Sequence, residues 1–353
     1  MKIIEPSFEM YDIPEPTDRD GVLMHLEKIG RTCYKSEDKI TLGSANKFLQ
    51  NIRNHKHWAM LEHYIFTVSV PEWIYRDIQE SIEEVSLYED SEAINKLRFI
   101  NSTCWGNYSE EKYQYLVSFS ITSLNYLYNC NIFDDNHGIS TLIRFMRYYY
   151  PELIIPARTA RERNKAFNHD EIEFVSREEM KTLPKWIREV HDFMSVKFTI
   201  DRGITHEVVR HRPASYAQES TRYCNYSQGK FGNEITVILP SFFDTGMGEM
   251  SNSLVYNEWK TSCESSERHY FKLLEMGATP QQARSVLPNS LKAELIMTAN
   301  LYEFRHFFNM RCPTSAHPQM REVAVPLLSE LIDNEYYRNV FEDQSYLTTV
   351  IGE

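Results

Sequence analysis

The sequence has 353 residues, of which 42% are hydrophobic and 13% aromatic, enough for a packed core in one large domain or in two. Its formal net charge of −12 argues against general binding to nucleic acid or to anionic membranes, which requires a broad basic surface. The chain lacks a run of about eighteen apolar residues, and its start, Met1 to Pro6, lacks the apolar stretch of a secretory signal. The six cysteines form no Cys-x-x-Cys pair, which is typical of a reducing compartment, so we expect a cytoplasmic protein.

The first part of the chain is predicted to form two helices and a strand. Apolar residues recur with helical spacing over 21–29 and over 45–52. The run 64–70 is rich in β-branched and aromatic residues and ends at Pro71, a pattern that predicts a strand. A similar run over 196–200 predicts a second strand.

The residues between these two strands are interpreted as an insertion, because strands that pair antiparallel are usually joined by short loops. We expect 71–196 to be an inserted helical segment, with helices over 111–128 and 141–150. It contains no catalytic motif, and a role in packing, in oligomer contacts or as a lid stays open.

The second part of the chain alternates helical and strand patterns. Pro213 ends the first of these helices, and Gly277 follows the longest one in the position of a left-handed cap. Pro326 either kinks the closing helix or marks its start. The predicted elements are a helix over 204–211, a strand over 235–239, helices over 254–276 and 281–287, a strand or helix over 295–298, and helices over 304–310 and 320–332.

These elements predict an α+β fold in which a small, mostly antiparallel sheet packs with helices. We expect a single domain, 1–353, whose core is formed by 1–70 and 197–335, with 71–196 inserted.

The segment 210–223 concentrates three arginines, a histidine and two serines. Arginine meets phosphate or carboxylate in a bidentate way, and neighbouring guanidinium groups repel one another unless an anion lies between them. A solvated basic loop is the alternative. We favour an anion site, because the protein is acidic and Arg210, Arg212 and Arg222 alternate with Ser, Gln and Tyr. Arg284 and Arg311 end or interrupt apolar runs, so partial burial would require an acceptor partner for each.

Other kinds of site are less well supported. His206 and His211 lie five positions apart and face different directions on a helix, so we expect no metal site from them. Neither Gly-x-Gly-x-x-Gly nor a Walker sequence is present. Cys224 and Ser220 could be nucleophiles, but no base can be assigned to either, and we favour a bystander thiol and a hydrogen-bonding hydroxyl.

Taken in order, these residues resemble the signature of the flavin-dependent thymidylate synthases. That signature, Arg-His-Arg followed by a spacer and Ser-x-Arg-Tyr, stands here as Arg210-His211-Arg212 and Ser220-Thr221-Arg222-Tyr223. The resemblance covers about residues 20–70 and 197–332. The supporting matches are His57, Glu62-His63, Ala283-Arg284, Val286-Leu287-Pro288, Thr298-Ala299-Asn300 and 307–311.

The resemblance implies methylation of dUMP to dTMP by a homotetramer with active sites between subunits. It implies FAD as cofactor, with methylenetetrahydrofolate and NADPH as co-substrates, and neither nucleic acid, membrane nor metal as a partner. Arg311 would be catalytic, polarising the pyrimidine. The implied dUMP-binding residues are Glu207, Arg210, Gln218, Ser220, Arg222, Arg284 and Arg311. The implied FAD-binding residues are His57, Ala59, Arg210, His211, Arg212, Gln218, Asn300 and His306.

The chain departs from the family pattern at Glu207, where members often have Gln, at Ala217, where they often have Asn, and over Pro318 to Arg321. Glu207 could accept from a ring N–H but would repel a phosphate. Three alternatives stay open: a relative that methylates another pyrimidine nucleotide such as UMP, a non-catalytic nucleotide- or flavin-binding protein, and a structural oligomer with an anion site.

Overall fold

The computed structural model describes residues 1–87, 97–107, 112–130, 138–155, 171–227, 229–243 and 254–349. The strands are β1 (Lys2–Ile4), β2 (Ser7–Tyr11), β3 (Ile65–Val70), β4 (Ile100–Asn107), β5 (Lys112–Ser120), β6 (Glu173–Phe174), β7 (Phe193–Asp201), β8 (Ser215–Gln218), β9 (Thr236–Ile238) and β10 (Lys292–Asn300). The α-helices are α1 (Arg19–Thr32), α2 (Ser44–Asn54), α3 (Glu72–Leu87), α5 (Ile121–Asn129), α6 (Gly138–Tyr149), α8 (Arg177–Thr182), α9 (Lys185–His191), α10 (Arg202–Val208), α11 (Leu254–Glu275), α12 (Pro280–Ala283), α13 (Leu301–Arg311), α14 (Pro318–Asp333) and α15 (Arg338–Phe341). The 3₁₀ turns are η1 (Glu37–Lys39), η2 (Trp58–His63), η4 (Gly229–Phe231), η5 (Ser241–Phe243), η7 (Arg284–Val286) and η8 (Glu342–Leu347).

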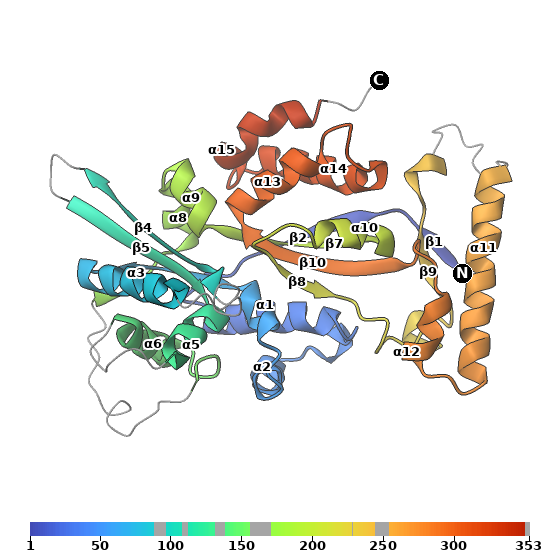
Figure 1. Cartoon of the computed structure of the whole chain (residues 1–353), viewed down its shortest axis with the longest axis horizontal. Helices are drawn as coiled ribbons and strands as arrows, with labels where there is room; N and C mark the ends of the chain where they lie inside the picture. Colours follow the sequence, from blue (N-terminus) through green and yellow to red (C-terminus); the bar gives the residue numbers. More distant parts are fainter. Residues whose placement is uncertain are drawn as a thin grey trace.

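The central sheet has the strand order β2-β7-β10-β8, and every neighbouring pair is antiparallel. β7 and β10 pair along their whole length, from Asp201 opposite Lys292 to Phe193 opposite Asn300. Helices α13 and α14 cover one face of this sheet (Figure 1) and share a hydrophobic core with β7 and β10. α1 packs on the other face, where Ile29 meets Ala217 and Ile296. The α+β class predicted from the sequence is therefore confirmed.

A second antiparallel sheet, in the order β4-β5-β3-β6, is built largely from the predicted insertion. The expected helix over 111–128 is wrong in its first half, because 112–120 is β5 and only 121–129 is helical. Strands 64–70 and 196–200 do not pair, since β3 lies between β5 and β6 and β7 lies between β2 and β10. The segment 71–196 is thus not purely helical, although the helix expected over 141–150 is present as α6.

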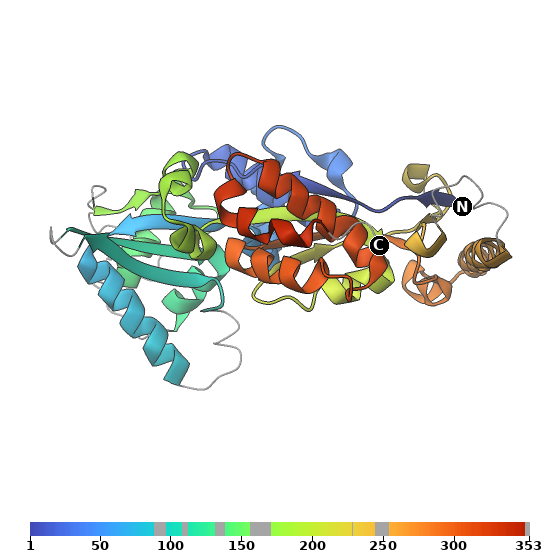
Figure 2. The same ribbon diagram turned by 90° about the horizontal axis from the view of Figure 1, so that it is seen from above.

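The two sheets lie side by side (Figure 2), and most of their apolar residues form two separate hydrophobic cores. They are joined by Phe193 of β7, which packs in the core of the second sheet, and by polar contacts. His63 Nδ1 lies 2.7 Å from the hydroxyl of Thr298, which lies 2.7 Å from the hydroxyl of Ser195. Nearby, Asp192 accepts hydrogen bonds from Arg177 at 2.6 Å and from Arg188 at 3.0 Å. These bonds tie the end of β7 to α8 and α9.

Two of the predicted helices are shorter in the structure: the helix expected over 204–211 ends at Val208, so Pro213 does not end it, and 281–287 is α12 followed by the 3₁₀ turn η7. The helices and strands expected at 21–29, 45–52, 64–70, 196–200, 235–239, 254–276 and 304–310 are all present within one to three residues at each end. The ambiguous run 295–298 is strand, inside β10. The closing helix begins at Pro318 and contains Pro326 in its interior, so Pro326 is not its start. Among the described residues, none of the helices combines the length and the apolar character needed to span a bilayer.

Candidate functional site

Two helix ends bring Glu207, His211 and Arg311 together. α10 begins at Asp201, whose side chain accepts from the backbone N–H of Ile204 at 2.7 Å, and Glu207 lies in its last turn. α13 begins directly after β10, where the Asn300 side chain accepts from the N–H of Glu303 at 2.9 Å. Capping of this kind satisfies N–H groups that the helix cannot bond internally. Arg311 is the last residue of α13 and therefore reaches the loop that follows α10.

Arg311 is held by three hydrogen bonds. Nη1 donates to the Glu207 carboxylate at 2.7 Å, Nη2 donates to the Glu207 carbonyl at 3.0 Å, and Nε donates to His211 Nε2 at 2.9 Å. The Arg311 side chain is 17% exposed, and the sequence expectation of a partly buried guanidinium with an acceptor partner is confirmed. A guanidinium has five N–H groups, so two remain without a bond to any described residue.

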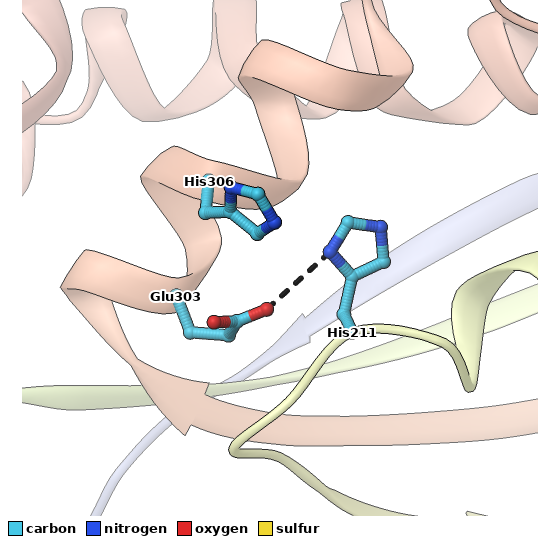
Figure 3. Close-up of side chains that lie close together, drawn as sticks. All are labelled: His211, Glu303 and His306. Carbon is cyan, nitrogen blue, oxygen red and sulfur yellow. Dashed lines mark ion pairs between the residues drawn. The ribbon is translucent and has the colours of Figure 1, made fainter.

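His211 belongs to the loop between α10 and β8, and its ring points towards α13 (Figure 3). Its Nδ1 is 3.3 Å from Oε1 of Glu303, and both side chains are buried. The exposed ring of His306 lies with its centroid 5.5 Å from that of His211, and Phe307 packs against His211 at 5.0 Å. One ligand atom from each of His211, Glu303 and His306 lies within 4.8 Å of the others. Glu303 was not among the candidate site residues predicted from the sequence. The sequence does contain a signal for it, because Glu303 is an acidic residue within the Phe-rich sequence of α13.

A second group forms around the turn after β8. Arg284 donates to the Thr221 hydroxyl at 3.2 Å, and Arg222 Nε donates to the Gln281 side chain at 3.2 Å. The N–H of Arg222 lies 3.4 Å from the Ser220 hydroxyl. Ser220, Arg222 and Arg284 therefore share one surface, with both guanidinium groups exposed.

The histidine expected to contact flavin lies beside this second group. The Tyr34 hydroxyl is 3.4 Å from Nδ1 of His57, and the Tyr34 ring packs against Tyr223 with centroids 5.3 Å apart. His57 and Ala59 are exposed at the start of η2.

Gln218 of β8 lies next to α10, where it donates to the Thr205 hydroxyl at 3.1 Å. The side chains of Arg210 and Arg212 are exposed and make no hydrogen bond or ion pair with a described residue.

A buried charge network adjoins the second group at the edge of a hollow of about 540 Å³. Lys292 donates to Glu219 at 2.8 Å and to Glu294 at 3.0 Å, and Lys35 also pairs with Glu294. Burial alone would raise the pKa of Glu294, but the charges of Lys292 and Lys35 outweigh it and lower the pKa to about 2. The network ties Glu219, next to Ser220, to β10, and it was not predicted from the sequence.

Cys224 is 1% exposed, which favours the bystander role over that of a nucleophile.

Comparison with known proteins identifies a family and a set of relatives. The model of the family described as thymidylate synthase complementing protein matches residues 140–334, more than half of the chain. The flavin-dependent thymidylate synthase of Pyrococcus abyssi is 31% identical over 141 residues, which are 40% of this chain and 54% of that protein. The protein of the same name from Saccharolobus solfataricus is 30% identical over 190 residues, covering 51% of this chain and 66% of the relative.

The match to the first of these relatives spans about half of that protein's length. The Pyrococcus horikoshii flavin-dependent thymidylate synthase gives a similar figure, 34% identity over 55% of its length. The family match includes α10, β8, β10 and α13, the elements that carry both groups of candidate residues. On the strength of that match, the chain belongs to the family described as thymidylate synthase complementing protein.

Proposed function

We propose that the protein is a flavin-dependent thymidylate synthase that methylates dUMP to dTMP. Methylenetetrahydrofolate would donate the carbon and NADPH would reduce the FAD cofactor. The observation that carries the proposal is the arrangement of Arg311, which is fixed by Glu207 and His211 and keeps two N–H groups free of described partners. The names of the relatives support the same reaction.

The nucleotide would be held from two sides. Its phosphate is a compact dianion, and Arg222 and Arg284 offer exposed guanidinium groups beside the Ser220 hydroxyl. Gln218 and Arg210 would add further hydrogen bonds. Arg311 would donate to the uracil carbonyl and stabilise the negative charge that develops on the ring.

Glu207 neutralises Arg311 in this structure and leaves the guanidinium oriented. This contact offers a role for a carboxylate at a position where a free acid would repel a phosphate, because the acid is paired with Arg311.

The residues present fit a flavin nucleotide. Arg210 and Arg212 present exposed guanidinium groups, without partners among the described residues, that suit its pyrophosphate. The exposed His306 supplies an aromatic surface, and the buried His211 packs behind it. Bound flavin would supply hydride chemistry that no side chain can perform. Four further residues would complete the flavin site: His57 and Ala59 at the start of η2, Gln218 at the end of β8, and Asn300 at the start of α13.

We propose a homotetramer in which Arg222 and Arg311 of one site come from different subunits, as the resemblance to the flavin-dependent thymidylate synthases implies. Mixing Arg222→Ala protein with Arg311→Ala protein tests this arrangement. After subunit exchange, random assortment restores both halves in about a quarter of the sites if the halves come from different subunits. Recovered turnover supports the shared site, and a mixture as inactive as its components contradicts it. The cytoplasmic location stays a prediction.

The reaction itself is tested by the visible spectrum. Purified protein should carry a yellow flavin that NADPH bleaches and that regains colour when dUMP and methylenetetrahydrofolate are added, with formation of dTMP. Turnover with UMP in place of dUMP would assign a different nucleotide. Binding of FAD and dUMP without dTMP would refute the enzymatic proposal, and a melting temperature unmoved by dUMP would refute nucleotide binding as well.

A further inference from the structure

Three side chains form a line that ends at Arg311. Glu303 in the first turn of α13 faces His211, and His211 faces Arg311 at the other end of the same helix. His211 and Glu303 are 4% and 3% exposed, so their interaction is shielded from water. An interaction in such a setting is stronger than on the surface.

The contact with Arg311 fixes the tautomer of His211. The Nε–H of Arg311 donates to His211 Nε2 at 2.9 Å, so Nε2 must offer its lone pair. A neutral imidazole carries one proton, which is then on Nδ1. Nδ1 lies 3.3 Å from Oε1 of Glu303, slightly longer than an ordinary N–H···O bond of about 2.9 Å. Both atoms are buried and neither makes a hydrogen bond with a described residue, so each is the nearest group that could satisfy the other.

A metal ion on His211, Glu303 and His306 is the competing explanation of this cluster. A metal bound at Nδ1 would move the imidazole proton to Nε2. That proton would then face the Nε–H of Arg311 across 2.9 Å, two donors against each other. The observed contact therefore favours a hydrogen-bonded line over a metal site.

We infer that Glu303 is a positioning residue for Arg311. It keeps the proton on Nδ1 of His211, so that Nε2 accepts the hydrogen bond from the Nε–H of Arg311. This bond holds the two free N–H groups of Arg311 in a fixed direction. The consequence for turnover rests on the proposed function. Of the other charged groups near the line, Glu207 holds Arg311 from α10, and His306 flanks His211 from α13.

The tautomer can be measured in the ligand-free protein. In protein labelled with ¹⁵N-histidine, the ring signals of His211 are assigned by their loss in His211→Gln. We expect a protonated Nδ1 and an unprotonated Nε2 near neutral pH. A proton on Nε2 would overturn the inference, and this result needs neither a Glu303 variant nor catalysis.

Variants of Glu303 test the transmission to Arg311. In Glu303→Leu the acceptor is gone, whereas the amide oxygen of Glu303→Gln can still accept from Nδ1. We therefore expect the Arg311 Nε–H to exchange with solvent about tenfold faster in Glu303→Leu, which corresponds to about 1.4 kcal/mol. Glu303→Gln should stay close to wild type. Exposed Glu330 of α14 provides the control substitution, Glu330→Leu.

Turnover gives a second measure of the same variants. We expect the kcat of Glu303→Leu to fall about tenfold or more with the KM for NADPH unchanged, and Glu303→Gln to restore most of it. Unchanged Arg311 exchange in folded Glu303→Leu would overturn the inference. If Glu303→Leu does not fold, two other measurements test the inference. These are the exchange rate of the Arg311 Nε–H in Glu303→Gln, which should equal that of the wild type, and the tautomer of His211 in the wild-type protein. Wild-type protein without turnover would refute the proposed function. The tautomer of His211 and the exchange rates of Arg311 would still test whether Glu303 positions Arg311.

Discussion

Acid should weaken the contact between the second sheet and α9 through the imidazole of His191. This ring is 1% exposed, with Nδ1 3.0 Å from the Ser118 hydroxyl and Nε2 2.7 Å from the Thr103 hydroxyl. Hydroxyl groups can satisfy a neutral imidazole, but they do not compensate a buried positive charge. Burial therefore lowers the pKa of His191 from 6.5 to about 4.

The sign and size of the effect follow from this shift. Since the folded protein disfavours the proton, the stabilisation is complete above the unfolded pKa of 6.5 and is lost as the pH falls towards the folded pKa of about 4. With about 1.4 kcal/mol for each pH unit between the two pKa values, the free energy of unfolding decreases by about 3 kcal/mol.

Urea unfolding between about pH 7 and about pH 4 measures the effect when wild type is compared with His191→Gln. Burial also lowers the pKa values of His25, to about 4, and His63, to about 3, and both groups remain in the variant, so subtraction isolates His191. The wild type should lose about 3 kcal/mol more than His191→Gln over this range. His269→Gln, at an exposed position on α11, should follow the wild type. Parallel curves for wild type and His191→Gln would refute the reasoning.

Three further substitutions have definite expectations. Asp192→Asn leaves the fully buried Arg188 without its anion and should cost about 3–5 kcal/mol in urea unfolding, whereas Glu335→Gln, which removes an exposed partner, should leave the midpoint unchanged. Gly277→Ala should cost about 1–2 kcal/mol by the same measurement, because the new Cβ meets no atom within 4 Å but φ is +91°. Cys224→Ala should keep its initial rate of dTMP formation within about threefold, since a buried thiol does not touch substrate; complete loss in folded, flavin-loaded protein would contradict this.

Individual helices and strands could be predicted from the sequence where the spacing of apolar residues agrees with residues that mark the ends of an element. Gly277 ends α11 and Thr279 caps α12 as their types predict, because φ above zero and side-chain capping are local properties. Strand pairing is not local, so the sequence could not show that β3 joins the second sheet. The run 112–120 was mistaken for helix because it continues directly into α5 without a turn residue.

Candidate site residues that belong to a motif, such as Arg222 and Arg311, can be found by type and spacing. The structure places Arg311 beside Glu207 and His211, and the backbone N–H of Arg222 beside the Ser220 hydroxyl. Glu303 has no motif of its own, and its importance arises from the tertiary approach of His211. That Arg222 and Arg311 serve one nucleotide across a subunit contact stays a proposal, which the mixture of Arg222→Ala and Arg311→Ala protein tests.

Helix α13 fixes the spacing of several candidate site residues. Asn300 anchors its first turn, Glu303 and His306 follow one turn apart, and Arg311 ends it. Each residue of a helix turns about 100°, so deleting one residue between Asn300 and Arg311 would swing the guanidinium away from Glu207. Three of the four strands of the second sheet lie between β3 and β7, whereas α13 has only eleven residues and its contacts lie at both ends. We therefore expect a change in the length of α13 to be more damaging than a change in the composition of its exposed face.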